Sequence, residues 1–359
     1  MTSLLNLDDY ERAARDRLEG SIYHYVAGGA LDEITLTENR TAYDKWRFRP
    51  RTMVGVEHRD LTVNILGDRL SLPIGISPSA FHKLVHPDGE LATARAASDC
   101  GTLMCVSVMA TVSLEEIAAV ASGPLWLQTY IFKDRGFAID LATRARAAGY
   151  RALVLTVDTP VLGRRERDSR NKFELPRGIE MRNLKLPAAV TDSYESPMVR
   201  FITEQIDPSL TWRDVEKFVQ TVQLPVFVKG ILHPGDVLLA AQSGVSGVIV
   251  SNHGGRQLDG AIATLDALPE IVSAAHGTTL DLIVDGGIRR GADVVKALAL
   301  GAKMVMVGRP VLWGLAVDGE AGARAVLEIL RREFDTALAL IGCSHAVDLN
   351  MDYLTRLDY

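Results

Sequence analysis

Short apolar runs bounded by turn residues recur along the whole chain, and they are its main structural signal. Eight such runs occupy residues 72–78, 102–107, 125–130, 152–158, 225–230, 247–252, 281–286 and 304–309. Several are apolar at consecutive positions, which is typical of parallel strands that are buried on both faces. The pattern therefore predicts eight parallel strands.

Between these runs the sequence is amphipathic with a helical period. Residues 211–222 begin with Thr211 and Asp214 at capping positions and then place apolar residues along one face, and residues 291–300 show a comparable pattern. Most strand-to-strand spacings approach the roughly 30 residues of one strand–helix–strand unit. Eight units in series predict an α/β fold, a closed (β/α)8 TIM barrel. An open doubly wound sheet is the alternative.

Three segments lie outside this alternation. Residues 1–60 are predicted to form N-terminal helices. Residues 61–73 have the pattern of a hairpin that turns at Gly67–Asp68 and could close the barrel floor. Residues 163–208 show neither a strand nor a helix pattern, and a loop of this length is typical of an active-site lid. We therefore expect a single domain over residues 1–359, with the barrel at 61–345.

Composition narrows the range of partners and compartments. The 359 residues carry a net charge of −6 and no long run of Lys or Arg, so nucleic acid is not an expected partner. No apolar run approaches the ~20 residues of a membrane span, and the acidic first residues do not resemble an export signal. Cys100, Cys105 and Cys343 lack a metal-ligand spacing, so we expect reduced thiols, no metal site and a cytoplasmic protein.

Polar residues stand at the carboxyl ends of all eight predicted strands. They are Ser77 and Ser79 (on either side of Pro78), Ser107, Gln128, Tyr130, Thr156, Asp158, Lys229, Ser251, Asn252, His253, Asp285, and Arg309 after Gly308. In a barrel these ends meet at one rim, where barrel enzymes build their active sites. One polar strand end would mean little, but eight together, with Lys, His, Asp and Arg among them, predict a site at this rim.

The segment SNHGGRQLDG at residues 251–260 carries the most specific chemistry. A turn alone would need only Gly, Asn or Asp, whereas this one adds a titratable base and a fixed cation. We interpret His253 as a catalytic base and Arg256 as a clamp for an anionic substrate. DGGIRRG (285–291) and GRP (308–310) have the glycines and arginines of a phosphate site, although ordinary glycine turns explain them equally well on their own.

Four motifs together resemble one known family. SNHGGRQLD, LTVDTPVLGRRERDSRN (155–171), VKG (228–230) and DGGIRRG strongly resemble the FMN-dependent α-hydroxy acid oxidases and dehydrogenases, the glycolate oxidase-like family, and the resemblance extends over nearly the whole chain. It implies FMN as the cofactor. The cofactor-binding residues that it implies are Pro78, Ser79, Ala80, Ser107, Gln128 and Thr156 around the ring, Lys229 beside its N1–C2 edge, Ser251 at the ribityl chain, and Asp285, Gly286, Gly287, Arg289, Gly308 and Arg309 around the ribityl phosphate.

The same resemblance implies the substrate side of the site. Its residues are His253 as the base, Asp158 as the carboxylate that orients it, Tyr25 and Tyr130 as hydroxyls for the substrate oxygens, and Arg165 and Arg256 for the substrate carboxylate. Planar guanidinium groups grip a carboxylate bidentately, which would fix the orientation of a 2-hydroxy acid. A base works best with a pKa near neutrality, and a neighbouring aspartate raises the pKa of an imidazole.

The substrate side chain is expected from one position and from overall similarity. Met109 stands where small-acid oxidases of this family often carry a bulky aromatic residue, and a flexible thioether leaves room for a larger side chain. The sequence also resembles the bacterial 4-hydroxymandelate oxidases of aryl-glycine antibiotic pathways. We therefore expect oxidation of (S)-4-hydroxymandelate or mandelate to the aryl glyoxylate, with O2 reduced to H2O2. Oxidation of glycolate or lactate, and a flavin dehydrogenase with another electron acceptor, are the alternatives.

The predicted lid bears on solubility. The membrane-bound mandelate dehydrogenases of this family have an apolar insertion there, whereas this chain has polar residues: Glu174, Arg177, Glu180, Arg182, Lys185, Asp192 and Glu195. A soluble oxidase is therefore expected, and related barrels often assemble as homotetramers. Two rivals belong to other classes: a phosphosugar aldolase with Lys229 as a Schiff-base nucleophile, and a catalytically inactive binding barrel. His253 together with Asp158 argues against both.

Overall fold

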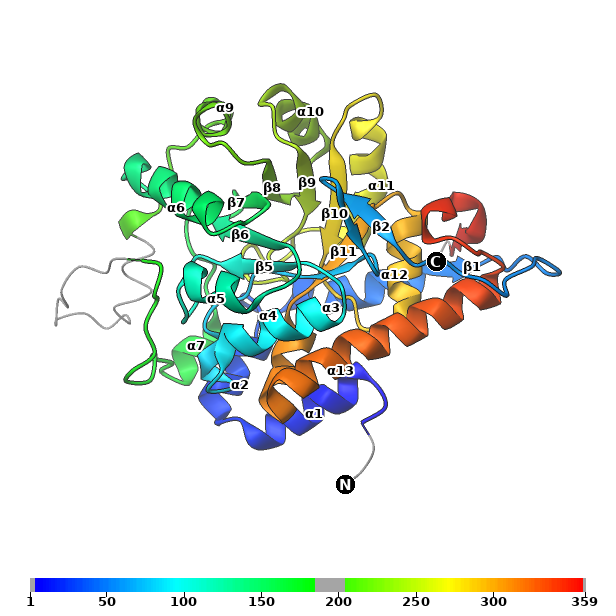
Figure 1. Ribbon diagram of the computed structural model, residues 1–359, viewed down its shortest axis with the longest axis horizontal. Coiled ribbons are helices and arrows are strands. Elements are labelled where there is room, and N and C mark those ends of the chain that lie inside the picture. Colours follow the sequence, from blue (N-terminus) through cyan, green and yellow to red (C-terminus); the bar gives the residue numbers. More distant parts are fainter. Residues whose placement is uncertain (1–3, 185–203, 358–359) are drawn as a thin grey trace.

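Eight parallel strands close into a barrel in the computed structural model, which describes residues 4–184 and 204–357 (Figure 1). The strands are β4 (Ile74–Ile76), β5 (Met104–Ser107), β6 (Leu125–Thr129), β7 (Ala152–Thr156), β8 (Val226–Ile231), β9 (Gly247–Val250), β10 (Asp281–Asp285) and β11 (Met304–Val307). Their order around the barrel is β10–β11–β4–β5–β6–β7–β8–β9. The predicted (β/α)8 barrel is confirmed, and each observed strand overlaps one predicted run.

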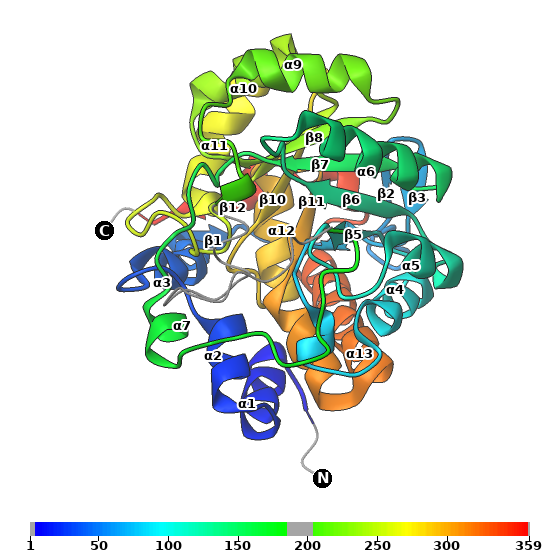
Figure 2. The same ribbon diagram turned by 90° about the vertical axis from the view of Figure 1, so that its left-hand side faces the viewer.

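Helices surround the barrel and extend below it (Figures 1 and 2). They are α1 (Leu7–Arg17), α2 (Gly20–Ala27), α3 (Ile34–Thr41), α4 (Gly89–Asp99), α5 (Leu114–Val120), α6 (Arg135–Ala147), α7 (Glu166–Arg170), α9 (Trp212–Thr221), α10 (Pro234–Gln242), α11 (Thr264–Ala275), α12 (Gly291–Ala299) and α13 (Arg309–Ile341), with short 3₁₀ turns at Ala42–Lys45, His82–Leu84, Ala346–Asp348 and Met351–Tyr353. Helix α9 begins as its sequence predicts, because the backbone N–H and the hydroxyl of Thr211 both donate to Asp214, at 2.9 and 2.8 Å.

The hairpin before the barrel packs into the barrel interior. Strands β2 (Val63–Ile65) and β3 (Asp68–Leu70) pair antiparallel, and their apolar side chains join a buried cluster with residues from inside the barrel. The hairpin therefore covers one end of the barrel, as expected. The predicted turn at Gly67–Asp68 is wrong by one residue, since Leu66 and Gly67 form it with φ of 49° and 83°. A two-residue turn with positive φ at both positions matches the twist of the two strands.

Two elements depart from the predicted pattern outside the barrel. The N-terminal segment holds the expected helices but also β1 (Trp46–Phe48), which pairs antiparallel with β12 (Leu354–Arg356). A strand of three residues carries too little alternation to be read from the sequence. The segment 163–208 was expected to have no regular structure, yet α7 lies within it, with acidic Glu166 and Asp168 in its first turn and Arg170 in its last. Lys185, Asp192 and Glu195 of the predicted lid lie outside the described residues.

Candidate active site

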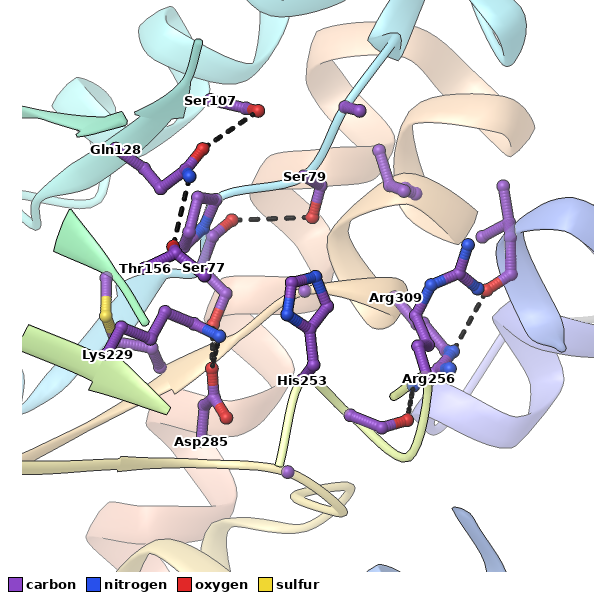
Figure 3. Close-up of a pocket in the computed structure, with 18 of the residues that line it drawn as sticks. Ser77, Ser79, Ser107, Gln128, Thr156, Lys229, His253, Arg256, Asp285 and Arg309 are labelled. Atoms are coloured by element: carbon purple, nitrogen blue, oxygen red, sulfur yellow. Dashed lines mark hydrogen bonds and ion pairs between the residues drawn. The ribbon is translucent and has the colours of Figure 1, made fainter. Parts of the chain in front are cut away.

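One pocket collects the polar strand ends of the barrel (Figure 3). Nineteen of the residues expected in the site line it: Tyr25, Pro78, Ser79, Ala80, Ser107, Met109, Gln128, Tyr130, Thr156, Arg165, Lys229, His253, Arg256, Asp285, Gly286, Gly287, Arg289, Gly308 and Arg309. The two remaining ones, Asp158 and Ser251, stand behind the lining and bind His253 and Lys229 respectively. All twenty-one predicted residues thus meet at the same rim.

His253 lies in the middle of this pocket against a buried carboxylate. Its Nδ1 is 2.9 Å from Oδ1 of Asp158, which also accepts a hydrogen bond from the Thr159 hydroxyl at 3.0 Å. The imidazole is held from behind by Asp158, and in Figure 3 the ring projects between Lys229 on one side and Arg256 on the other. A histidine fixed through Nδ1 has its Nε2 available to exchange a proton with a bound molecule.

The charges of this pair follow from burial and mutual attraction. Burial lowers the pKa of His253 below its ordinary 6.5, and the opposing effect of Asp158 does not make up the difference. Burial alone would raise the pKa of Asp158, but His253 and Lys229 outweigh it and hold that pKa below its usual value. The net effect on His253 differs from the sequence expectation of a pKa raised toward neutrality. At neutral pH the pair is a neutral imidazole beside a carboxylate, which is the state a base requires.

Glycine makes room for this carboxylate. Gly230 of the VKG motif has φ of 110°, and a Cβ on it would lie 2.5 Å from Cβ of Asp158. No other residue fits there without moving Asp158. The close approach of the ends of β7 and β8 therefore explains the glycine of the VKG motif.

Arginines are concentrated in the pocket far beyond what the nearby carboxylates balance. Burial first, and then neighbouring Arg165, lower the pKa of Arg256 to about 10. Burial also lowers the pKa of Arg289 to about 10 and that of Arg309 well below its usual value. Buried cations without full compensation are costly, so a pocket built this way favours anionic ligands. Two anions fit the residues present, a carboxylate near Arg165 and Arg256 and a phosphate near Arg289.

Arg256 and Arg309 also bind the N-terminal segment. Nη1 of Arg256 donates to the carbonyls of Tyr25 and Gly28, both at 2.8 Å. Arg309 donates to the carbonyls of Val26, Gly28 and Gly254 at 2.8–3.0 Å. The donors of Arg309 therefore point at backbone oxygens, and its contact with a phosphate stays a prediction. Tyr25 and Val26 of this segment line the pocket.

Lys229 is a buried ammonium at the opposite wall. Its Nζ donates to the Ser251 hydroxyl at 2.8 Å. The same Nζ lies 3.4 Å from Oδ2 of Asp285 (Figure 3). Burial would lower the pKa of Lys229, but Asp285 and Asp158 outweigh it and raise that pKa. The lysine is therefore charged at neutral pH. A charged lysine is not a Schiff-base nucleophile, which argues against the aldolase alternative.

Neutral polar side chains continue along the neighbouring strand ends. The Ser107 hydroxyl donates to Oε1 of Gln128 at 3.2 Å, and Nε2 of Gln128 donates to the Thr156 hydroxyl at 3.0 Å. These groups are buried and face the pocket with their remaining hydrogen-bonding capacity. Such a row of hydrogen-bonding side chains suits the polar edge of a flat heterocycle.

The loop after β10 has the features of a phosphate cradle. Gly286 and Gly287 have φ of 101° and 78°, and a Cβ on Gly287 would lie 1.8 Å from the carbonyl oxygen of Asn39. Nε of Arg289 is buried and lacks a hydrogen-bond partner among the described residues, while its guanidinium carbon lies 4.9 Å from the centre of the Trp313 ring. A turn of two glycines, beside an arginine donor that has no hydrogen-bond partner, is suited to bind a phosphate group.

Some residues of the site escaped the sequence analysis. Phe173 stacks on Tyr25 with ring centres 4.3 Å apart and an interplanar angle of 11°. Gln257 donates to the carbonyls of Asp158 and Val161 at 2.9 and 3.0 Å. Its Oε1 accepts from the N–H of Gly163 at 3.1 Å, which ties the start of the predicted lid to the loop after β9. Phe173 has no local sequence pattern that would reveal its role. Gln257 belongs to the SNHGGRQ motif, which was the available signal for it.

The chain matches the FMN-dependent dehydrogenase family over residues 14–356. It belongs to this family. FMN is the family's cofactor, and the buried arginines, the glycine cradle and the polar strand ends described above fit it. L-lactate oxidase from a Nostoc species is 48% identical over 99% of both chains, and glycolate oxidase from Spinacia oleracea is 45% identical over 98% of this chain and 95% of that protein. The enzyme family oxidises 2-hydroxy acids.

Solved structures of mandelate-oxidising enzymes have the same fold. Mandelate oxidase with (S)-4-hydroxymandelic acid is 43% identical, with a TM-score of 0.93 over 98% of this chain and 99% of that one. A soluble mutant of the membrane-associated (S)-mandelate dehydrogenase from Pseudomonas putida is 37% identical, with a TM-score of 0.91. Within the described residues of this FMN-dependent dehydrogenase, no helix is long and apolar enough to span a bilayer.

Proposed function

We propose that this enzyme oxidises an (S)-2-hydroxy acid of the mandelate type, with 4-hydroxymandelate as the leading candidate, to the aryl glyoxylate. Two electrons and two protons leave the acid and reduce O2 to H2O2. The observation that carries the proposal is the His253–Asp158 pair, which faces a pocket whose walls also hold Arg165, Arg256 and Lys229.

The arginines bind and orient the acid. Arg256 is fixed by its bonds to the N-terminal backbone, and Nε of Arg165 is buried without a hydrogen-bond partner among the described residues. A carboxylate between the two guanidinium groups would satisfy that donor and offset the buried charge. Tyr25 and Tyr130 line the same wall, and burial raises the pKa of both hydroxyls, so both stay protonated and can donate to substrate oxygens.

His253 takes a proton from the acid. The neutral imidazole is available at neutral pH, and the imidazolium that forms is stabilised by Asp158, which remains charged throughout. The surrounding walls limit the access of water to this exchange, because Tyr130 and Met109 are buried and His253 is mostly buried. The residues of this chain therefore hold the base in position and hold the substrate in one orientation.

FMN would supply the redox chemistry of the reaction, as the carrier of two electrons between the acid and the final acceptor. The residues that would hold it are those of the glycine cradle with Arg289, the row Ser107–Gln128–Thr156, and Lys229. The charged Lys229 would stabilise the negative charge that accumulates beside it on reduction.

The apolar part of the pocket supports a large side chain. Ala80, Met109 and Leu162 line it together with Tyr25 and Tyr130. Ala80 is small and Met109 adapts its shape, so an aryl ring finds apolar contacts there. The L-lactate oxidase relative supports a smaller acid as the second candidate.

The test is a panel of acids added anaerobically to purified holoenzyme. We expect the yellow colour to bleach with (S)-mandelate and (S)-4-hydroxymandelate and to persist with glycolate and L-lactate. The reverse preference would contradict the proposed substrate while leaving the reaction class intact. Admitting air to the bleached enzyme should restore the colour and release one H2O2 per acid oxidised. Slow reoxidation in air would instead identify a dehydrogenase with another acceptor.

A further inference from the structure

The base stands in an unusual backbone conformation. His253, Gly254 and Gly255 have φ of 59°, 65° and 74°, so three consecutive residues occupy the left-handed region. Glycine tolerates this conformation, whereas a histidine in it is strained and keeps it only where neighbouring groups hold it. Something must therefore hold the His253–Gly255 turn.

Asn252 makes the contacts that define this turn. Both its backbone carbonyl and its side-chain Oδ1 accept from the N–H of Gly255, each at 3.1 Å. Its Nδ2 donates to the carbonyl of Ile262 at 3.1 Å, which closes the loop after β9. The Asn252 side chain therefore fixes the turn only while its amide keeps one orientation.

Asn39 sets that orientation. The two amides form a reciprocal pair: Nδ2 of Asn39 donates to Oδ1 of Asn252, and Nδ2 of Asn252 donates to Oδ1 of Asn39, both at 2.8 Å. Asn39 is 2% exposed and Asn252 4%, so water does not compete for these bonds. Asn39 belongs to α3, which lies outside the barrel and 213 positions earlier in the chain.

We propose that the Asn39–Asn252 amide pair holds the catalytic base in place, so that the N-terminal segment controls the geometry of the reaction. Both asparagines are positioning residues, because they act through the turn that carries His253 and not on the substrate. The inference rests on the proposed role of His253 as the base. A further contact supports it, since the N–H of Ala30 donates to the carbonyl of Gly255 at 2.8 Å.

The first test compares Asn39→Ala with Thr35→Val. Thr35 lies on the same helix and donates from its hydroxyl to the carbonyl of Ala261 at 3.0 Å, so Thr35→Val removes one partly buried bond between α3 and the same loop without touching the turn. The probe is the acid that bleaches the wild-type holoenzyme fastest among (S)-mandelate, L-lactate and glycolate. We expect Asn39→Ala to slow anaerobic bleaching at saturating acid about 10- to 100-fold. Thr35→Val should stay within about twofold of the wild type, although both lower the melting temperature.

The second test uses Asn39→Asp, whose effect depends on pH. A protonated carboxyl can donate to Oδ1 of Asn252 and accept from its Nδ2, which reproduces the amide pair, whereas a carboxylate can only accept. The bleaching rate of this variant, divided by that of the wild type at the same pH, should therefore fall as the pH rises. This ratio decides the question even where Asn39→Ala does not fold.

The outcomes separate the two proposals. A wild-type holoenzyme that no acid bleaches would overturn the proposed function and this inference with it. A bleaching wild type combined with an unchanged rate in Asn39→Ala, an equal loss in Thr35→Val, or a ratio for Asn39→Asp that does not change with pH would overturn the inference alone.

Discussion

His253 and Asp158 are 95 positions apart in the chain, yet Nδ1 of one lies 2.9 Å from Oδ1 of the other. The first sits in a left-handed turn after β9 and the second follows β7, with β8 between these two strands in the barrel. Their contact depends on the barrel being closed in this order. The local sequence places each of the two residues after a particular strand, and the closed barrel brings the two residues together.

Replacing the base should separate binding from chemistry. His253→Ala leaves the arginines, Lys229 and the glycine cradle untouched, so we expect the variant to purify yellow. Anaerobic bleaching by (S)-mandelate should slow about 10²- to 10⁴-fold, the usual contribution of a positioned base. Stopped-flow absorbance measures the rate. Bleaching at the wild-type rate would show that His253 has another role.

The pH dependence of the free enzyme follows from the buried imidazole. The reaction needs neutral His253, and burial lowers its pKa, so kcat/KM should rise with pH and level off with a midpoint below 6.5. Asp158→Asn removes the group that raises the pKa of His253, so its midpoint should move lower still, and its kcat should fall. A midpoint above 6.5 in the wild type would contradict this account of the pair.

The geometry of the carboxylate clamp predicts a loss on a conservative change. An ammonium at position 256 cannot serve the carbonyls of Tyr25 and Gly28 and the substrate at the same time. For Arg256→Lys we expect a KM for the acid raised about 10- to 100-fold, with a smaller change in kcat. Lys303→Arg is a matched control, because Lys303 pairs with Asp281 at the amino end of β10. An unchanged KM in Arg256→Lys would remove Arg256 from the clamp.

Activity on aryl acids should fall when the apolar wall grows. Met109→Trp fills the space that we assign to the aryl ring, so kcat/KM for (S)-mandelate should fall about 10-fold or more. The affinity for glycolate, measured as a Kd by titration of the flavin absorbance, should change little, because glycolate needs no such space. An equal loss of affinity for glycolate would indicate a general disturbance of the pocket instead of a specificity effect.

The floor of the barrel should contribute to stability without affecting chemistry. Ile65 is 1% exposed and packs with residues of the barrel interior. Ile65→Ala should lower the free energy of unfolding by about 2–5 kcal/mol, measured by denaturant titration. The KM for the acid should not change, because the hairpin does not line the pocket. A loss of less than about 0.5 kcal/mol would show that the floor is loosely packed.

The barrel was readable from the sequence because its signal is long-range and repeated. Each of the eight strands carries its own apolar run, and the polar residues at their ends share one rim. The Asn39–Asn252 pair was not readable, since an asparagine on α3 looks like any surface residue of a short helix. The pKa of His253 was misjudged for a related reason: the aspartate next to it was inferred, but the burial that outweighs it comes from packing around the whole pocket.

The pairing of β1 with β12 has a consequence for biosynthesis. β1 leaves the ribosome before any strand of the barrel, and β12 leaves it after all of them. Until then the edge of β1 carries unpaired backbone groups, a known template for association with other chains. The nascent protein thus spends most of its translation with its first strand unprotected. β1 can pair with β12 only after the last strand of the barrel has been made.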